Sequence, residues 1–349
     1  MKKIAVGLLV LVLGLYFSWG AIVPSIFARG IVQRLASTGP DLPDGLHVIL
    51  CGAGSPLPDP DRSPPCTLVV AGEKKFLFDV GSSANVGGMG FNMGDLDGVF
   101  LTHFHSDHIG GLGEAMLQRW IAGEHDHPLP VYGPNGVAHV VDGFNEAYGL
   151  DSIYRTAHHG EEIAPPAASG GTAITFNVIQ NELLSVYATD EVTIGAFNVT
   201  HDPVYPAVGY KITYKGRSVV ISGDTALSDN LFVHARGVDL LIHEAMSMEL
   251  VEMAEKGAAE AGNKTLEKIF FDIRDYHTDP EDIAKRAEEA NVGFLAFNHI
   301  VPALPLPGLE SIFLGDSAGY FAGPIHVGKD GDYFSLPAGS SEVQTGNLL

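Results

Sequence analysis

The stretch DGVFLTHFHSDHIG, residues 97–110, joins an apolar run to a cluster of side chains that can bind metal. Its first seven residues are rich in β-branched, aromatic and aliphatic side chains, which is typical of a buried strand. His103 and His105 stand two residues apart at the end of this strand, so in an extended backbone their side chains point the same way. Asp107 and His108 follow in the next turn. The spacing therefore predicts two neighbouring pairs of metal ligands.

Three further residues of ligand type stand alone, each directly after a β-rich run: His201 in VTHDP, Asp224 in VVISGDT and His299 in LAFNH. Strand ends deliver side chains to a common edge of a sheet, so we expect these residues to join the cluster. Asp224 has two carboxylate oxygens and can bridge two cations, which lie about 3.5–4 Å apart in two-metal hydrolases. The expected sites are His103, His105, His201 and Asp224 for one cation, and Asp107, His108, Asp224 and His299 for the other. Imidazole and carboxylate ligands suit zinc best, with manganese or iron as alternatives.

Strands and helices follow one another in two blocks. The first block has predicted strands at 46–51, 67–72, 75–80 and 97–103, and helices near 112–120 and 134–149. The second has strands in ITFNVI, LSVYAT, VTIGAFNVTH, AVGYKITY and RSVVISGD, helices near 228–235, 246–260, 264–275 and 281–290, and final strands at 292–299 and 331–337. Two such blocks predict an α/β fold in which two sheets pack face to face beneath outer helices, a four-layer αββα sandwich. The expected domain covers 46–337, and a flexible tail covers 338–349.

The N-terminal residues 1–29 differ from the rest of the chain. Two lysines precede an uncharged, mostly apolar stretch that ends before Arg29, and about 20 such residues suffice for a helix to cross a bilayer. The apolar region of a cleaved signal peptide has only about 7–15 residues. We therefore expect an uncleaved signal anchor in the inner membrane with the body on the periplasmic face, because the lysines stay in the cytoplasm. The alternative is a cleaved signal peptide and a secreted protein. Residues 30–45 are expected to be a linker.

The chain of 349 residues is acidic and has only two cysteines. It carries 20 Lys and Arg against 42 Asp and Glu, a formal net charge of −22. Such a field repels phosphate backbones and argues against a nucleic-acid partner, although an acidic surface can also serve solubility alone. Cys51 and Cys66 flank the loop GAGSPLPDPDRSPP, where they could form a disulfide in an oxidising compartment or remain free buried thiols. The sequence leaves this pairing and a homo-oligomeric state open.

Several motifs together resemble the metallo-β-lactamase superfamily: FDVG at 78–81, the HFHSDH cluster, the separate histidine, the SGDT aspartate and the final histidine. The resemblance covers nearly all of 46–337 and implies a dinuclear zinc hydrolase with the αββα fold. The segments CGAGSPLP, IHEA at 242–245 and YHTDPEDIAKRAEEANVGFLAFNH are similar to the ribonuclease Z branch of that superfamily. TAHHG at 156–160 and the N-terminal segment resemble the sulfatase-type members of the branch.

The resemblance also implies roles for individual residues. Asp79 in FDVG would support the metal site by accepting an N–H from a liganding imidazole, which fixes the orientation of that ring. His243 and Glu244 of IHEA would lie near the scissile ester, so we assign them the proton transfer to the leaving group, ahead of His277. Asp107 belongs to the catalytic set as well as to the ligands.

Two other groups of side chains are candidates for substrate contacts. Arg155, whose planar guanidinium suits sulfate or phosphate oxygens, stands near His158 and His159. A solvated or merely packed histidine pair is the alternative. Apolar residues of the helices expected between 246 and 275 could line a pocket for an aryl or alkyl group if those helices overhang the metals, although such residues more often pack in a core.

These features lead to an expected function. We expect an exported, metal-dependent hydrolase that cleaves a small-molecule sulfate ester, aryl or alkyl, with a hydroxide between two cations as the nucleophile. A phosphodiesterase of the ribonuclease Z type, acting on small or cyclic nucleotides or on RNA, is the alternative. A lactone or carboxylic-ester hydrolase would use the same ligands. A metal-stabilised binding protein without turnover is disfavoured because the ligand set is complete.

Overall fold

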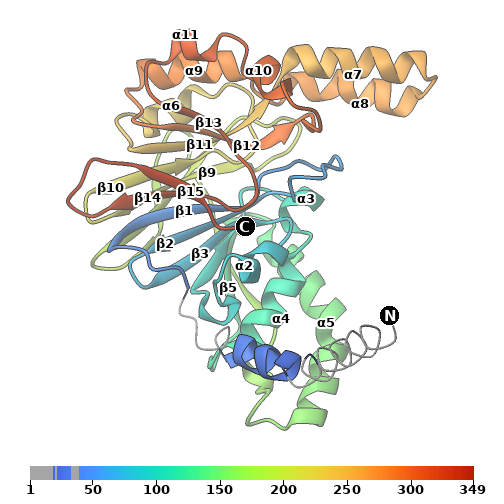
Figure 1. Cartoon of the computed structure of the whole chain (residues 1–349), viewed down its shortest axis with the longest axis vertical. Coiled ribbons are helices and arrows are strands. Elements are labelled where there is room, and N and C mark those ends of the chain that lie inside the picture. Colours follow the sequence, from blue (N-terminus) through green and yellow to red (C-terminus); the bar gives the residue numbers. More distant parts are fainter. Residues whose placement is uncertain (1–18, 20–21, 33–38) are drawn as a thin grey trace, which may run out of the picture. The chain divides into compact units, whose positions relative to one another are not determined.

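The computed structural model describes residue 19, residues 22–32 and residues 39–349 (Figure 1). The chain divides into two compact units, Met1–Pro40 and Asp41–Leu349. In the first unit, residues 22–32 are helical. The predicted signal anchor at 1–29 lies largely outside the described residues, and none of the described helices is long and apolar enough to span a bilayer. The second unit contains both sheets, so the predicted linker at 30–45 is divided between the two units.

The first sheet has eight strands in the order β15-β14-β1-β2-β3-β4-β5-β6. The strands are β1 (Gly45–Gly52), β2 (Cys66–Ala71), β3 (Lys74–Val80), β4 (Gly98–Phe100), β5 (Leu129–Pro134), β6 (Gly171–Phe176), β14 (Asp332–Pro337) and β15 (Gln344–Asn347). Pairing is antiparallel from β15 to β3 and parallel from β3 to β6. All four strands predicted in the first block are present, the last of them shortened to Gly98–Phe100.

The second sheet has seven strands in the order β13-β12-β11-β10-β9-β8-β7. The strands are β7 (Leu184–Ala188), β8 (Val192–Asn198), β9 (Val208–Tyr214), β10 (Arg217–Ile221), β11 (Leu240–Met246), β12 (Leu295–Val301) and β13 (Ile325–Val327). Pairing is antiparallel from β7 to β10 and parallel from β10 to β13. In each sheet the parallel part therefore brings several strand ends, and the residues that follow them, to one edge.

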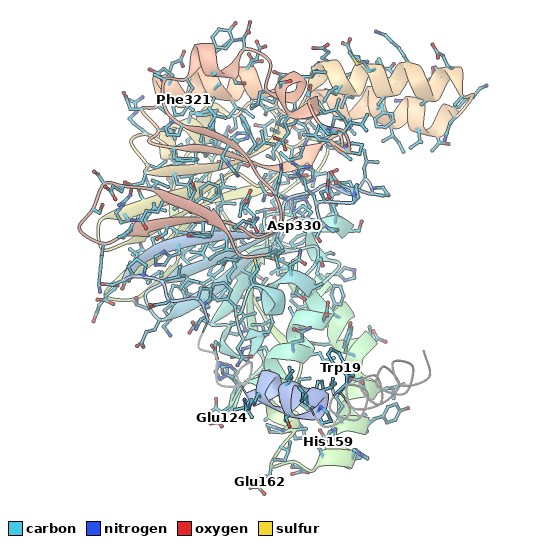
Figure 2. All side chains as sticks on the ribbon, viewed as in Figure 1. Trp19, Glu124, His159, Glu162, Phe321 and Asp330 are labelled. Carbon is cyan, nitrogen blue, oxygen red and sulfur yellow. A yellow bond between two sulfur atoms is a disulfide. The ribbon has the colours of Figure 1, made fainter. Side chains whose placement is uncertain are left out.

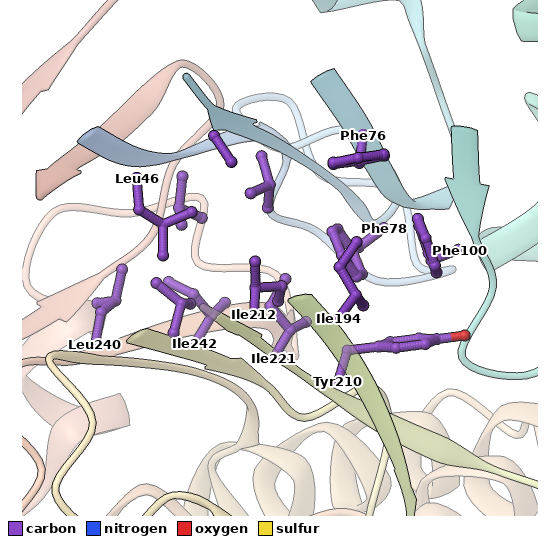
Figure 3. Close-up of a cluster of buried hydrophobic side chains, with 14 of the residues drawn as sticks. Leu46, Phe76, Phe78, Phe100, Ile194, Tyr210, Ile212, Ile221, Leu240 and Ile242 are labelled. Atoms are coloured by element: carbon purple, nitrogen blue, oxygen red, sulfur yellow. The ribbon is translucent and has the colours of Figure 1, made fainter. Parts of the chain in front are cut away.

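The main core lies between the sheets (Figure 3), where Phe76 and Phe78 of the first sheet face Tyr210, Ile212 and Ile242 of the second. Helices cover both outer faces (Figure 1). The first sheet carries α2 (Ala84–Gly88), α4 (Leu112–Ala122) and α5 (Val137–His159), and the second carries α6 (Asp229–His234), α9 (Pro280–Glu289), α10 (Leu309–Leu314) and α11 (Ser317–Tyr320). Short 3-10 turns occur at η1 (Met93–Asp95) and η2 (Pro166–Ala168). The predicted α/β fold with two facing sheets is confirmed.

A pair of helices follows β11 and projects beyond the second sheet (Figure 1). It consists of α7 (Met248–Glu260) and α8 (Lys264–Asp272), and the 3-10 turn η3 (Ile273–Asp275) continues it. Both helices begin at a residue whose side chain accepts a backbone N–H, Ser247 from Leu250 and Asn263 from Leu266. Gly262 lies between the helices with φ of 71°, a conformation that glycine adopts without strain. We call this pair the α7–α8 hairpin.

Several elements differ from the prediction. The strands β5, β11 and β13 are absent from the predicted set, and ITFNVI, expected in the second block, contributes to β6 of the first sheet. The sequence predicts a flexible tail at 338–349, but β15 within it pairs with β14. Without β15 the strand β14 would present an unpaired edge, and Asn347 Nδ2 also donates a hydrogen bond of 2.9 Å to Asp332 Oδ1. The helix predicted near 134–149 continues as α5 to His159, where Gly160 ends it with φ of 86°.

Candidate metal centre

The seven predicted metal ligands meet at one edge of the sheets. They come from the segment after β4, from the short helix α3 (Ser106–Ile109), from the segments after β8 and β10, and from β12. One group consists of His103, His105, His201 and Asp224, and the other of Asp107, His108 and His299; within each group the ligand atoms lie within 4.8 Å of one another. Residues distant in sequence are therefore brought together as the spacing predicts.

Asp224 lies between the two groups. Its Oδ2 atom is 3.7 Å from His103 Nε2 and 3.8 Å from His201 Nε2. On the other side, Oδ1 is 3.3 Å from His108 Nε2 and Oδ2 is 3.4 Å from His299 Nε2. These separations exceed the roughly 2.7–3.2 Å of an ordinary N–H···O hydrogen bond. They suit donors that share a cation, and Asp224 has the position of a carboxylate common to two cations.

The buried polar atoms of the cluster fit such cations. Five of these atoms have no hydrogen-bond partner among the described residues: Nε2 of His103, His108 and His201, Oδ1 of Asp224 and Nδ1 of His299. The Nδ1 atoms of two of these rings are hydrogen-bonded: His108 Nδ1 lies 2.8 Å from Asp79 Oδ2, and His201 Nδ1 lies 3.0 Å from Tyr276 O. An unpaired buried polar atom costs about 1–3 kcal/mol. Divalent cations would satisfy the three Nε2 atoms and Asp224 Oδ1, and the histidine and carboxylate donors suit zinc, manganese or iron.

The charge states of His103 and Asp224 agree with metal binding. Burial lowers the pKa of His103 well below its ordinary value, which keeps the imidazole neutral and able to donate a lone pair. Burial alone would raise the pKa of Asp224, but the neighbouring His108 and His299 hold it well below the usual range. The carboxylate therefore stays ionised.

Asp79 supports the cluster from behind, as the resemblance implies. Its Oδ1 accepts the backbone N–H of Thr102 at 2.8 Å, and its Oδ2 accepts the Thr102 hydroxyl, also at 2.8 Å. The same Oδ2 accepts from His108 Nδ1. These bonds fix the orientation of the His108 ring so that Nε2 points into the centre.

Two residues of the centre have a left-handed backbone. Asp79 has φ of 56° and His299 has φ of 46°, although both are non-glycine residues. His299 stands where the pairing of β11 with β12 shifts register, between Glu244 and Ala245. Such conformations cost about 1–3 kcal/mol and persist where the surrounding structure holds them. The backbone is thus bent at the two points that aim Asp79 and His299.

Glu244 and His277 form a pair beside the ligands. Glu244 Oε2 lies 3.2 Å from His277 Nδ1, and Oε1 accepts the backbone N–H of Thr278 at 3.0 Å. A ring nitrogen of His277 lies within 4.8 Å of ligand atoms of Asp224 and His299. Burial disfavours the charged form of His277, but the Glu244 carboxylate outweighs it, and the pKa of His277 is raised.

His243 does not share this position. Successive residues of a strand face opposite sides, so Glu244 faces the centre while His243 faces the helix layer, where its ring stacks on Phe232 at 5.9 Å. Its side chain is fully buried, and burial lowers its pKa. His277 lines the cavity and His243 does not, so the geometry does not place His243 near the scissile ester as predicted.

A cavity of about 260 Å³ opens beside the ligands. Its polar side consists of Ser55, His105, Ser106, Asp107, Asp224, His277 and His299, and its other side of Pro56, Leu57, Ile269, Ile273, Tyr276 and Val301. We call the set Leu57, Ile269, Ile273 and Val301 the apolar wall. A substrate in this cavity would contact the metal ligands, His277 and the apolar wall together.

Comparison with known proteins agrees with this geometry. Residues 59–261 match the family model of the metallo-beta-lactamase superfamily. A ribonuclease Z of Mycobacterium bovis (strain BCG / Pasteur 1173P2) is 36% identical over 289 residues, covering 82% of this chain and 96% of that protein. The chain belongs to the metallo-beta-lactamase superfamily, in its ribonuclease Z-like branch.

Solved structures of superfamily members share the fold. The human short-form tRNase Z has a TM-score of 0.58 at 19% identity, covering 83% of this chain and 99% of that one. The metallo-beta-lactamase fold protein YhfI of Bacillus subtilis has a TM-score of 0.58 at 21% identity, covering 84% and 100%. The predicted likeness to sulfatase-type members finds no support in these matches.

The three residues predicted to bind the anionic end of a substrate lie elsewhere in this superfamily fold. Arg155, His158 and His159 are on the last turns of α5, where Figure 2 labels His159, and none of them lines the cavity. Arg155 Nε donates to Asp151 Oδ2 at 2.7 Å, and the two exposed histidine rings meet edge to face with their centres 4.8 Å apart. The prediction assumed a loop here, but the longer α5 keeps these side chains on its own surface.

Other residues of the centre are not predicted from the sequence. Thr102 is hydrogen-bonded to Asp79, and the backbone carbonyl of Tyr276 is hydrogen-bonded to His201. The only signal for them in the sequence is that each is adjacent to a predicted site residue.

Cys51 and Cys66, whose pairing the sequence leaves open, form a disulfide. This bond closes the loop 52–65, which carries Leu57 of the apolar wall.

Proposed function

We propose that the chain is a metal-dependent phosphodiesterase of the ribonuclease Z type. The observation that carries the proposal is His277, which is hydrogen-bonded to Glu244 and lines the same cavity as His105, Asp107, Asp224 and His299 of the ligand set. The 36% identity to a ribonuclease Z supports phosphodiesters over the sulfate esters expected from the sequence. The absence of Arg155, His158 and His159 from the cavity lining removes the feature that favoured sulfate.

The reaction consumes one water molecule. Its oxygen becomes bonded to phosphorus, the bond between phosphorus and the leaving oxygen breaks, and a monoester and an alcohol result. Two divalent cations, when bound, supply Lewis acidity and a nucleophile that is active near neutral pH. His105, His201 and the other ligands would hold them.

The proton for the leaving oxygen comes from His277 in this proposal. Glu244 accepts from Nδ1 of His277, which leaves the other ring nitrogen for the cavity. Because Glu244 raises the pKa of His277, the imidazolium is present over more of the neutral range than for an ordinary histidine. Solvent returns the proton to the ring after the alcohol leaves.

A substrate panel tests the proposal. The full chain, loaded with zinc or with manganese, would be assayed on bis-p-nitrophenyl phosphate, p-nitrophenyl sulfate and an RNA hairpin with a 3′ extension. We expect kcat/KM for the diester to exceed that for the sulfate at least about tenfold, with Arg155→Ala unchanged as a control. A preference for the sulfate would restore the sulfatase hypothesis. Inactivity on all three with two metals bound would contradict the proposal.

Export remains a separate proposal. It is supported by the uncharged apolar stretch over 4–28 and by the Cys51–Cys66 disulfide, which an oxidising compartment favours. Fractionation of cells that express the full chain would test it, and recovery of the chain in the cytosolic fraction would overturn it.

A further inference from the structure

The apolar wall of the cavity comes from three parts of the chain. Leu57 lies in the loop closed by the disulfide, Ile269 and Ile273 lie on α8 and η3, and Val301 ends β12. Leu57, Ile273 and Val301 belong to one hydrophobic cluster under the α7–α8 hairpin, so the base of the wall is packed and fixed. Ile269 is 43% exposed, although it is a large aliphatic residue beside a metal centre. Its open surface is available to a ligand.

The wall continues outward along α8. Leu266, Ile269 and Ile273 are spaced i, i+3 and i+7, which places them on one face of a helix. Leu266 is 36% exposed, lies about one turn before Ile269 on α8 and does not line the cavity. Phe271 of the same helix instead contacts Arg274, whose guanidinium lies 4.6 Å from the centre of its ring. A continuous apolar strip therefore leads from Ile273 in the cavity to Leu266 at the surface.

The charges around the cavity do not suit a polyanion. Of the described residues that line it, none is a lysine or an arginine. The segment 248–275 carries seven acidic and four basic side chains. A polynucleotide brings one phosphate per nucleotide and depends on lysine and arginine contacts to neutralise them. The lining offers a second phosphate no lysine or arginine, whereas it offers an apolar group the exposed side chain of Ile269.

We propose that the substrate is a small phosphodiester with one apolar ester group, aryl or alkyl, which lies on Leu57, Ile269 and Ile273. This inference rests on the proposed function, because it names the substrate class of the same site. The sequence leaves open whether the apolar residues between 246 and 275 only pack in a core or also line a pocket. Ile273 packs in a core in part, but Ile269 does not.

Binding of n-alkylphosphonates tests the inference without turnover. The metal-loaded full chain would be titrated by calorimetry with methyl-, ethyl-, butyl- and hexylphosphonate, each of which has one anionic end and one apolar group. Burial of each methylene should strengthen binding about threefold to fourfold until the strip is covered. The matched variants are Ile269→Glu and Phe271→Glu, since both residues are exposed on α8 and only Ile269 lines the cavity.

The expected result is that Ile269→Glu abolishes the dependence on chain length and Phe271→Glu keeps it, with both variants retaining two metals and their helical content. Equal binding of all four phosphonates, or no difference between the two variants, would overturn the inference. A kcat/KM for the RNA hairpin above that for bis-p-nitrophenyl phosphate would also overturn it. Chain-length dependence without hydrolysis of any diester would support the apolar subsite and contradict the proposed function.

Discussion

The metal centre and the apolar wall share one cavity but are built in opposite ways. The ligands of the centre follow or end strands of two packed sheets, and partners such as Asp79 hold their rings from behind. Of the wall, Leu57 stands on the loop 52–65, Ile269 and Ile273 stand on the end of the α7–α8 hairpin, which projects beyond the sheet (Figure 1), and only Val301 belongs to a strand. Loops and projecting elements tolerate change better than sheet edges. We infer that the sheet edge determines the reaction and that the wall determines which ester is accepted.

The largest effect should come from breaking the centre at Asp224. Asp224→Ala removes the one carboxylate that lies between both groups of ligands, so both cations should be lost. Changing a residue that only supports a ligand already costs about 10–100-fold, so hydrolysis of bis-p-nitrophenyl phosphate should fall by more than about 100-fold. Metal analysis and rates would be measured together, with Asp229→Ala as an exposed control. Two bound metals and full activity in Asp224→Ala would refute the shared-ligand assignment.

A smaller, substrate-dependent loss should follow at His277. His277→Ala should keep both metals and lower kcat by about 10²–10⁴-fold for an alcohol leaving group. The loss should be much less for p-nitrophenolate, which leaves without a proton. Rates on a dinucleotide and on bis-p-nitrophenyl phosphate would separate the two cases. An equal loss on both substrates would argue against a role as proton donor.

The pH profile gives a second view of the Glu244–His277 pair. The glutamate raises the pKa of His277, so the imidazolium should persist above the ordinary histidine value and activity should decline only as pH rises through the raised pKa. In Glu244→Gln the pKa should fall, which moves this alkaline limb to lower pH. In His277→Ala the limb should disappear. An unchanged profile in both variants would assign the limb to another group.

Removing the carboxylate behind the ligands should weaken the centre without abolishing it. Asp79→Asn replaces one acceptor oxygen of the pair that serves Thr102 and His108. We expect a 10–100-fold loss of metal affinity, which is about the usual cost for such partners. Competition with a chelator of known affinity would measure it. Unchanged affinity would show that the His108 ring is held without Asp79.

The smallest effect on the chemistry should come from the disulfide. Its loop entropy is worth about 3 kcal/mol for a loop of this length, so the free energy of unfolding of a Cys51→Ser and Cys66→Ser double variant, measured in urea, should be lower by about that amount. The metal content should remain, because no ligand lies in the loop. Hexylphosphonate binding should weaken more than methylphosphonate binding because Leu57 loses its anchor. If the binding of both phosphonates weakened equally, the proposal that the apolar wall acts separately from the metal centre would be contradicted.

The ligands could be predicted from the sequence because each is attached to a recognisable strand, and strand ends meet at a sheet edge. The position of His243 is harder to predict. All residues of β11 are buried, so burial does not tell which of His243 and Glu244 faces the centre. Strand alternation shows only that the two side chains face opposite sides of the sheet. The error at Arg155 arose from the helix end, because nothing before Gly160 stops α5. The exposure of the Ile269 side chain depends on the direction in which the α7–α8 hairpin projects from the sheet, and this direction cannot be predicted from a local sequence pattern.

The most direct test of the central claim is a metal titration of the metal-free full chain. Bound zinc and the rate on bis-p-nitrophenyl phosphate would be followed in parallel as zinc is added. The account predicts that the rate reaches its plateau when two equivalents are bound, because both ligand groups and their shared Asp224 act together. A plateau at one equivalent, or a rate independent of bound zinc, would contradict it.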